Sequence, residues 1–327
     1  MNADAAATHP FENLLPEIVL GAAEAAGRVP DGRLLALNSY ENRVWQIGIE
    51  EETPLIAKFY RPGRWTDAAI LEEHAFTAEL AQGGLSVVAP LSIDGQTLLE
   101  YAGFRYALFP RQGGHAPEPE HEDTLRRIGR ALGRMHTAGA ASAFVHRGQI
   151  GIATMGREQA DWLLTERWIP AHLEPAFASL VENLLEHAAA AWQRAGKFTE
   201  IRLHGDCHPG NILWRDGPHF VDLDDCRTGP AVQDLWMLIS GEADERRRQW
   251  DWLLEGYKMF CDFDPRQLHL VEALRALRMI DHQAWLARRW DDPAFPRAFP
   301  WFADERHWET VVNQLREQLS ELQEPVI

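Results

Sequence analysis

The chain has 327 residues, of which 46% are hydrophobic and 25% charged, so it is long enough for two packed units and is not a disordered polymer. Acidic residues outnumber basic ones by 49 to 32, and the formal charge of −17 argues against nucleic acid as a partner. No stretch approaches the roughly 18 apolar residues of a membrane-spanning helix, and the N-terminus lacks a signal-peptide pattern, so we expect a cytoplasmic protein without a membrane partner.

The first hundred residues favour strands. Three runs rich in apolar residues are separated by short polar turns, which predicts an antiparallel meander over Arg33–Ser39, Arg43–Ile49 and Leu55–Tyr60. Good helix formers then predict a helix over Trp65–Gln82, which two glycines end. Further strands are expected over Val87–Ile93, Gln96–Glu100 and Arg105–Phe109.

Glycines and prolines interrupt this pattern over residues 109–119, and we place a boundary between two lobes after residue 110. Beyond it, apolar residues recur at spacings of three and four, as in helices. Helices are expected over residues 120–137, 160–164, 177–195, 233–239, 245–260, 267–289 and 304–322. The sequence therefore predicts an α+β fold, with a small antiparallel β-rich lobe at residues 1–110 and a larger, mainly helical lobe at 111–327.

The most informative segment spans residues 204–224. In it, Asp216 and Gly217 stand between two apolar runs, a sequence that favours a β-hairpin. Folding the chain about this pair places Asn211 opposite Asp222. A shift of one residue stays open, because a proline at the start of the second strand cannot donate a ladder hydrogen bond. Facing residues lie about 5 Å apart, so both side chains are expected to reach one ion.

The chemistry of these side chains suits phosphoryl transfer. An amide oxygen and a carboxylate are the hard donors that Mg²⁺ takes, and strand alternation makes Asp224 a second candidate contact beside Asp222. Asp206 precedes Asn211 by five residues, where a carboxylate can accept the proton of an attacking hydroxyl. A lone Asp in a loop more often shapes a turn or caps a helix, but the convergence of three such residues favours a catalytic centre.

The sequence HGDCHPGN at residues 204–211 resembles the H-G-D-x-H-x-x-N catalytic loop of aminoglycoside-phosphotransferase-like kinases. The similarity continues through residues 37–44, 58–62 and 229–236, and together these segments resemble the stress response kinase A family of bacterial Ser/Thr protein kinases. This resemblance implies a two-lobed protein-kinase-like fold that binds ATP between its lobes, with Mg²⁺ as the cofactor.

The resemblance also implies roles for single residues near the hairpin. Asp206 matches the catalytic base, Asn211 a magnesium ligand, and Asp222 the metal-binding aspartate, which also takes part in catalysis. His208 stands where protein kinases of the eukaryotic type carry a lysine. Asp234 matches an aspartate that braces the catalytic loop.

Three residues of the N-terminal lobe are predicted to bind ATP. Lys58, in the third expected strand, matches the lysine that holds the α- and β-phosphates. Its acidic partner is expected on the next helix, where Glu72 and Glu73 both qualify, and we choose Glu73 from its spacing to the helix end. Ser39 lies in the turn over the phosphates, where it either binds ATP, becomes phosphorylated or simply forms a hairpin turn.

The sequence thus predicts an ATP- and magnesium-dependent Ser/Thr protein kinase that acts as a monomer on protein substrates, itself included. The alternative is a small-molecule hydroxyl kinase of the aminoglycoside, choline or homoserine type. The eleven residues between Asp222 and Asp234 favour that alternative, because they are too few for a long activation loop. A non-catalytic nucleotide-binding protein disagrees with the intact set of Lys58, Asp206, Asn211 and Asp222.

Overall fold

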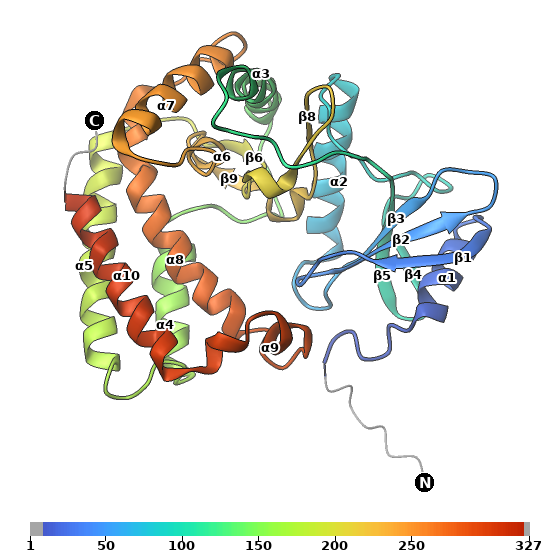
Figure 1. Ribbon diagram of the computed structural model, residues 1–327, viewed down its shortest axis with the longest axis horizontal. Coiled ribbons are helices and arrows are strands. Elements are labelled where there is room, and N and C mark those ends of the chain that lie inside the picture. The colour runs from blue at the N-terminus through green and yellow to red at the C-terminus, as the bar shows by residue number, and fades with distance from the viewer. Residues whose placement is uncertain (1–8, 324–327) are drawn as a thin grey trace.

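A computed structural model describes residues 9–323 and contains two lobes that lie side by side (Figure 1). A five-stranded antiparallel sheet forms the centre of the N-terminal lobe, and the C-terminal lobe is mainly helical. The expected α+β fold, with a β-rich lobe before a helical one, is confirmed. Within residues 9–323, no helix combines the length and the apolar character that a membrane span requires.

The N-terminal sheet is a meander whose central strand carries Lys58. Its strand order is β1-β2-β3-β5-β4. Lys58, in β3, faces Val44 of β2 on one side and Ala107 of β5 on the other. The sheet therefore fixes the backbone of Lys58 from both sides. The bounds from β1 to β5 are Pro30–Ala36, Arg43–Ile49, Leu55–Phe59, Leu99–Tyr101 and Phe104–Pro110.

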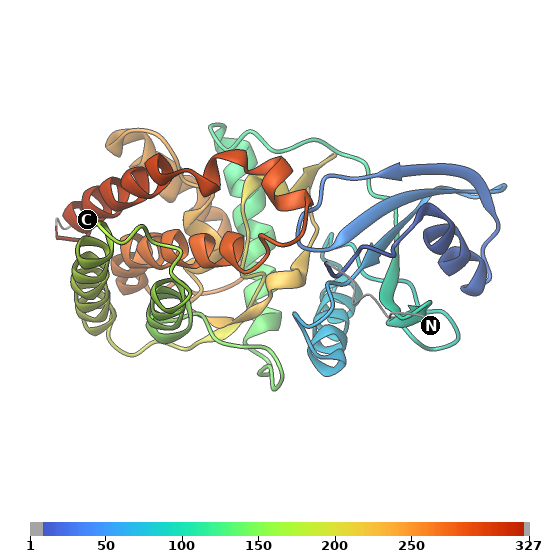
Figure 2. The ribbon, with the colours of Figure 1, turned by 90° about the horizontal axis from the view of Figure 1, so that it is seen from below.

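Two helices accompany this sheet. The sequence reasoning missed α1 (Pro16–Ala25), which packs against the sheet, with the hydroxyl of Tyr106 donating to the carbonyl of Ala22 at 2.7 Å. The helix α2 (Asp67–Gln82) matches the expected one, and the hydroxyl of Thr66 caps its first turn. The views from the front and from below both place α2 between the sheet and the C-terminal lobe (Figure 2).

Two expected strands of this lobe differ from the structure. The prediction of a strand at Val87–Ile93 is wrong, because part of this segment forms hydrogen bonds with the C-terminal lobe instead. The amide of Val88 donates to the carbonyl of Phe220 at 3.1 Å. The strand at Gln96–Glu100 is displaced to β4, at Leu99–Tyr101. Periodicity within a segment could not reveal a partner more than 130 residues away.

The C-terminal lobe packs its helices around one large apolar core. The bounds from α3 to α10 are Glu122–Gly139, Glu158–Thr165, Glu174–Ala195, Gln233–Trp236, Ala243–Tyr257, Val271–Ala287, Ala294–Ala298 and Glu305–Gln323. The expected helix at 267–289 divides into a 3-10 turn and α8. Two short ribbons lie between α5 and α6: β6 (Ile201–Leu203) pairs with β9 (Arg227–Gly229), and β7 (Ile212–Trp214) pairs with β8 (Pro218–Phe220).

A glycine lets α3 and α7 approach closely. A Cβ atom at Gly129 would lie 2.1 Å from the carbonyl oxygen of Leu253, so a larger residue requires the two helices to separate. Beside this contact, a ring nitrogen of His136 in α3 hydrogen-bonds to the hydroxyl of Tyr257 in α7 at 2.8 Å. The hydrogen bond between His136 and Tyr257 holds α3, the helix that supports the catalytic loop, against α7.

His74 links α2 to the sheet from a buried position. Its two ring nitrogens hydrogen-bond to the hydroxyls of Tyr60 at 2.7 Å and of Thr97 at 2.8 Å. Burial lowers the pKa of His74 to about 3, and the positive charges of Lys58 and Arg147 act in the same direction. The ring is therefore neutral in the folded protein at neutral pH.

Because folding lowers the pKa of His74, the free energy of unfolding decreases as the solution becomes acidic. Between about pH 6.5 and pH 3, the unfolded chain binds a proton at His74 that the folded chain does not bind. We expect His74→Gln to reduce the slope of the unfolding free energy against pH in this window, by up to about 1.4 kcal/mol per pH unit. Urea unfolding at several pH values between pH 5 and pH 7 measures this slope. His146→Gln, at an exposed position, should keep the wild-type slope, and an unchanged slope in His74→Gln would contradict the assignment.

Candidate active site

A cleft of about 940 Å³ separates the two lobes. The β1–β2 turn (residues 38–42) and β3 line it from the N-terminal lobe, and residues 109–112 line it where the chain crosses between lobes. The β7–β8 hairpin and α8 line it from the C-terminal lobe. The sequence-predicted residues Ser39, Lys58, Glu73, Asp206, Asn211 and Asp222 all contribute to this lining.

Lys58 lies among three carboxylates at the inner end of the cleft. Its ammonium is 2.9 Å from Asp222, 3.3 Å from Asp224 and 3.7 Å from Glu73. Burial lowers the pKa of Lys58, but the three carboxylates outweigh burial and hold the pKa well above its ordinary value. The ammonium therefore stays charged.

The choice of Glu73 over Glu72 agrees with the geometry. Burial raises the pKa of Glu73 to about 7, against the opposing charge of Lys58. Glu72 instead faces a loop of the C-terminal lobe, where its carboxylate accepts hydrogen bonds from the amides of Val145 and His146, both at 2.7 Å. A helix turns by about 100° per residue, so neighbouring acids point in different directions.

The register of the catalytic hairpin differs from the expected one by a single residue. Trp214 pairs with Pro218 and Ile212 with Phe220, so Asn211 lies opposite residue 221 rather than Asp222. The loop then has three residues, with Asp216 in the left-handed region at φ 59°. The prediction that Asn211 and Asp222 face each other across the ladder is wrong, because the proline takes the first paired position of β8.

The segment after the hairpin is a tight turn, not a continued strand. Asp222 itself has φ 59°, and residues 223–225 form a 3-10 turn. We expected Asp224 beside Asp222 because side chains alternate along a strand, and this reason is wrong because the segment is a turn. The turn nevertheless brings Asp224 to Lys58, because Asp224 points inward while the side chain of Asp222 stays 54% exposed in the cleft. No sequence period encodes this arrangement.

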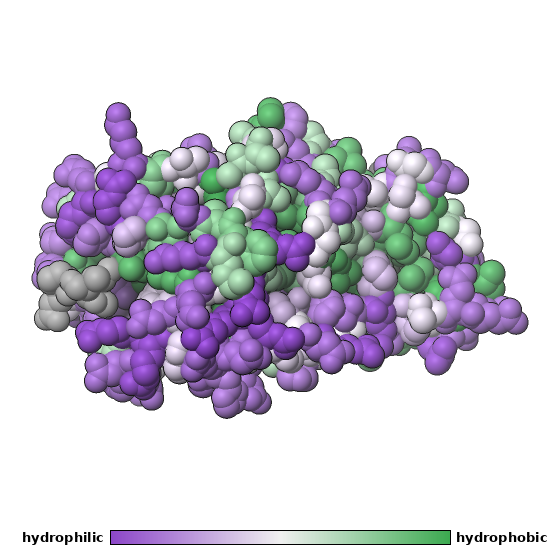
Figure 3. All heavy atoms as spheres, turned by 90° about the horizontal axis from the view of Figure 1, so that it is seen from above, coloured by the Kyte–Doolittle hydropathy of each residue, from purple (hydrophilic) through white to green (hydrophobic). Residues whose placement is uncertain are grey.

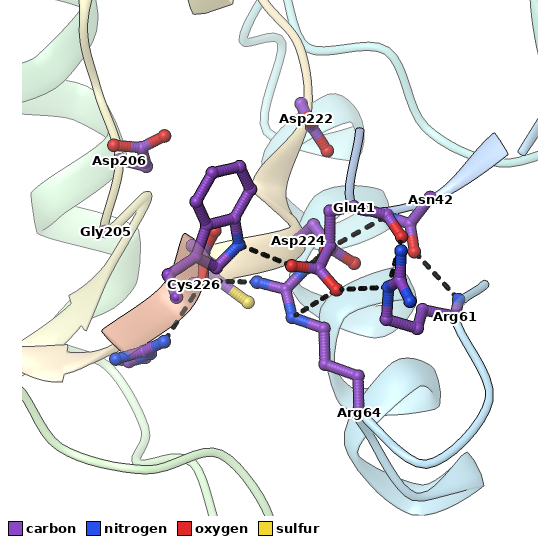
Figure 4. A network of polar contacts seen from close by, with 12 residues as sticks. Glu41, Asn42, Arg61, Arg64, Gly205, Asp206, Asp222, Asp224 and Cys226 are labelled. Atoms are coloured by element: carbon purple, nitrogen blue, oxygen red, sulfur yellow. Dashed lines mark hydrogen bonds and ion pairs between the residues drawn. The ribbon is translucent and has the colours of Figure 1, made fainter. Parts of the chain in front are cut away.

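Asp206 lines the same cleft and lies apart from Asp222 and Asp224 (Figure 4). One carboxylate oxygen forms an ion pair with Arg278 of α8 at 2.6 Å, and the other lies 3.5 Å from the ring of His208. Burial works against ionisation of Asp206, but the hydrogen bond from His208 and the charge of Arg278 lower its pKa below the ordinary value. Asp206 is therefore a carboxylate at neutral pH and accepts protons only transiently.

Asn211 is oriented by the catalytic loop. Its amide nitrogen donates to the backbone carbonyl of Asp206 at 2.9 Å, which turns its amide oxygen toward another partner. This amide oxygen and the exposed carboxylate of Asp222 are hard donors of the kind that fits magnesium. The oxygen of Asp224 that accepts no hydrogen bond lies 3.3 Å from the ammonium of Lys58 and is paired with that charge. Among residues 9–323, no group of three His, Cys, Asp or Glu is arranged to hold a metal.

Asp234 braces the catalytic loop, as expected. Its carboxylate accepts hydrogen bonds from the amides of His204 at 2.7 Å and Gly205 at 2.8 Å, and from His136 at 3.0 Å. Gly205 has φ 86°, and a Cβ there would lie 2.1 Å from the carbonyl of Asp225, so only glycine fits. The brace fixes the backbone next to Asp206.

Ser39 is placed in the cleft but is turned toward its own hairpin. Its hydroxyl accepts a hydrogen bond from the amide of Val44 at 3.0 Å, as in a hairpin turn. His208 likewise bonds locally, accepting from the amide of Gly210 at 3.0 Å. Contact of Ser39 with ATP stays a prediction.

Comparison with known proteins agrees with this geometry. The sequence profile described as "Phosphotransferase enzyme family" matches residues 33–271, which is more than half of the chain. The chain belongs to this phosphotransferase family.

Its relatives are kinases by name. The phosphotransferase is 45% identical to "Stress response kinase A" of Escherichia coli strain K12, over 96% of this chain and 95% of that protein. It is 44% identical, with the same coverage, to "Serine/threonine protein kinase RdoA" of Salmonella typhimurium strain LT2. The expected resemblance to stress response kinase A is confirmed, and a phosphotransferase of the kinase type is supported.

Solved structures share the fold at low sequence identity. Amicoumacin kinase hAmiN, in complex with AMP-PNP and Ca²⁺, has a TM-score of 0.71 and is 20% identical, with 95% of this chain and 94% of that chain covered. A microcompartment-associated aminopropanol kinase has a TM-score of 0.65 and is 19% identical, with 94% and 100% covered. These similarities establish the two-lobed kinase-like fold.

Sequence reasoning missed a set of ion pairs that joins the lobes of the phosphotransferase. Glu41, in the β1–β2 turn, forms ion pairs with Arg289, which follows α8, and with Arg61 at 3.1 Å (Figure 4). Asp292, which is 1% exposed, binds Arg43 at 2.7 Å and Arg61 at 2.6 Å. We call these five residues the interlobe latch. The residues that pair between lobes are 231 to 249 positions apart, so no local pattern marks them.

The latch fixes the β1–β2 turn, which lines the cleft from the N-terminal lobe. The side-chain amide nitrogen of Asn42 in the same turn donates to Asp224 at 3.1 Å, and its side-chain oxygen Oδ1 accepts from the backbone amide of Arg61 at 3.0 Å. In protein kinases a glycine-rich turn covers the phosphates of the nucleotide. Here side chains of the C-terminal lobe order a turn without glycine in advance, which reduces the entropy lost on binding.

We expect Arg289→Gln to weaken Mg-ATP binding by about tenfold, because the turn must then be ordered by the nucleotide. Isothermal titration calorimetry measures this. Arg288→Gln is the matched control, since the neighbouring arginine contacts Gln159 and Trp162 within the C-terminal lobe. Equal losses of affinity in the two variants would show that the latch does not order the turn.

Proposed function

We propose that the chain is an ATP- and magnesium-dependent Ser/Thr protein kinase. The observation that carries this proposal is the convergence of Lys58, Asp206, Asn211 and Asp222 on one cleft from separate segments. The names of the relatives that align with nearly the whole chain support a protein acceptor.

Each residue has a role that its surroundings permit. Lys58 stays charged among its carboxylates and would hold the phosphates of ATP, with Glu73 as its buried partner. Asn211 and Asp222 would hold magnesium, which neutralises phosphate charge when bound. Residues 109–112 would contact the adenine through their backbone, and Ser39 would approach the phosphates from the turn.

Asp206 would orient the acceptor hydroxyl and accept its proton as the phosphoryl group is transferred. Its depressed pKa keeps it ionised and ready to accept a hydrogen bond. Arg278 positions the carboxylate from α8, so the acceptor approaches between α8 and the catalytic loop. Catalysis then depends on positioning and electrostatics, because the protein forms no covalent bond with the phosphoryl group.

Two substitutions should separate catalysis from nucleotide binding. Asp206→Asn is expected to lower kcat by about a thousandfold or more while Mg-ATP affinity stays near wild type, since this side chain faces the acceptor. Asp222→Ala is expected to weaken Mg-ATP binding itself, because it removes a metal ligand. Calorimetry with and without magnesium, beside steady-state kinetics, measures both. Near-normal turnover in Asp206→Asn would remove that residue from its role.

The acceptor class is decided by direct labelling. We expect phosphoserine or phosphothreonine, on the chain itself or on an added general protein substrate, when the purified protein is incubated with ATP and Mg²⁺ and analysed by mass spectrometry. Asp206→Asn is the control for contaminating kinases. The short segment between Asp222 and Asp234 favours a small-molecule acceptor instead. Stimulation of ATP consumption by a small alcohol, without any phosphorylated protein, would establish that alternative and leave the catalytic residues in place.

A further inference from the structure

A second cavity, of about 700 Å³, lies outside the active-site cleft. It lies between α3, the turn of the β7–β8 hairpin and the end of α2, on the upper face of the molecule in Figure 1. Figure 3 shows this face, where strongly hydrophilic side chains cover much of the surface between apolar ones. Four arginines line the cavity, while Asp216 is the acidic residue in its lining. We call it the arginine groove, defined by Arg127, Arg130, Arg134 and Arg215.

The charge of this groove contrasts with the rest of the chain. The protein carries a formal charge of −17, yet here four guanidinium groups gather around one carboxylate. Within the described part of the chain, Arg130 and Arg215 are exposed and make no ion pair or side-chain hydrogen bond. Arg127 has only a distant carboxylate, Asp123 at 3.9 Å. Like charges placed together without partners repel each other, so a bound anion would stabilise the cluster.

The arginines form a row with an aromatic side chain near each end. Positions 127, 130 and 134 are spaced by three and four residues, so they share one face of α3 over about 10 Å. Arg127 lies over the ring of Trp214 at 5.6 Å, and Arg134 lies 5.9 Å from the ring of Phe260, which is 48% exposed. Arg134 also donates to the carbonyls of Gly83 and Gly84 at 2.9 and 3.0 Å, which fixes its position.

We propose that the arginine groove binds a phosphorylated peptide segment in an extended conformation. Guanidinium groups bind phosphate through paired hydrogen bonds, and clusters of arginine are a common means of recognising phosphopeptides. The exposed ring of Phe260 provides an apolar contact for a neighbouring peptide side chain. A long polyanion such as nucleic acid fits less well, because the row ends after about 10 Å and the surrounding chain is acidic.

The groove touches two of the segments that form the active-site cleft. Arg215 lies in the turn of the hairpin whose other end carries Asn211 and Asp222. Gln112 lines both the groove and the active-site cleft. A peptide in the groove therefore contacts the catalytic hairpin from its back without entering the nucleotide site. The inference goes beyond phosphoryl transfer and does not require it, since binding uses neither ATP nor Asp206.

The test uses the full-length protein without nucleotide. Two fluorescent pools of nine-residue peptides have random flanking positions and differ only in a central phosphoserine or serine. Fluorescence anisotropy should show the phosphoserine pool binding about tenfold more tightly or better, because each charge-assisted contact contributes on that order. Saturating Mg-ATP should leave this binding unchanged. Equal binding of both pools, or displacement by Mg-ATP, would overturn the proposal.

Two variants locate the site. Arg130→Ala/Arg215→Ala should lose the preference for phosphoserine, and the fold should persist because both side chains are exposed and unpaired within residues 9–323. Arg247→Ala/Arg248→Ala removes the same charge from exposed positions of α7 and should keep the preference. Equal effects of the two double variants would overturn the proposal. Inorganic phosphate that displaces the peptide pool at the same concentration as the peptide itself would instead define a small-anion site, which also contradicts it.

Discussion

The structure depends on the buried ion pairs of Lys58 with Glu73, Asp222 and Asp224. These four groups come from β3, α2 and the turn after β8, and Arg64 and Arg147 pair with two of the same acids, so buried charges hold both lobes and the hairpin together. Removing one partner from such a cluster leaves an uncompensated charge in a buried site, which is costly. The cluster is also the place where phosphate and magnesium would bind, so the interaction that stabilises the closed lobes is the one that ligands would rearrange.

The interlobe latch extends the same principle to the rim of the cleft. Asp292 is almost fully buried, and Arg43 and Arg61 reach it from the N-terminal lobe. Arginine suits such sites because its planar group forms several hydrogen bonds in fixed directions. The lobes are thus joined by charge pairs around the cleft and also by apolar packing, because Phe76 and Leu80 of α2 belong to the apolar cluster of the C-terminal lobe. The central sheet of the N-terminal lobe has an apolar cluster of its own.

Short-range features of the site were predictable because the chain encodes them locally. Asp206, Asn211 and Asp222 fall within seventeen positions, and the turn signal at Asp216 and Gly217 was enough to bring them together. The exact register was not predictable, since a three-residue loop and a two-residue loop suit the same turn residues and differ by one position in the ladder. The sequence failed to predict helix α1 and misplaced strand β4, because packing on a sheet outweighs weak local preferences.

The sequence by itself determined the order of the two lobes, most of the helices and the presence of Asp206 and Asp222 in one site, because these follow from periodicity and from motifs a few residues long. Only the tertiary structure decided that Asp222 and Asp224 also pair with Lys58, how Arg278 holds Asp206, and that Glu41 and Asp292 join the lobes. The arginine groove likewise exists only when α3, α2 and the hairpin turn meet. Charged side chains act over a few ångströms in space whatever their separation along the chain, and a sequence period does not record which distant charges folding brings together.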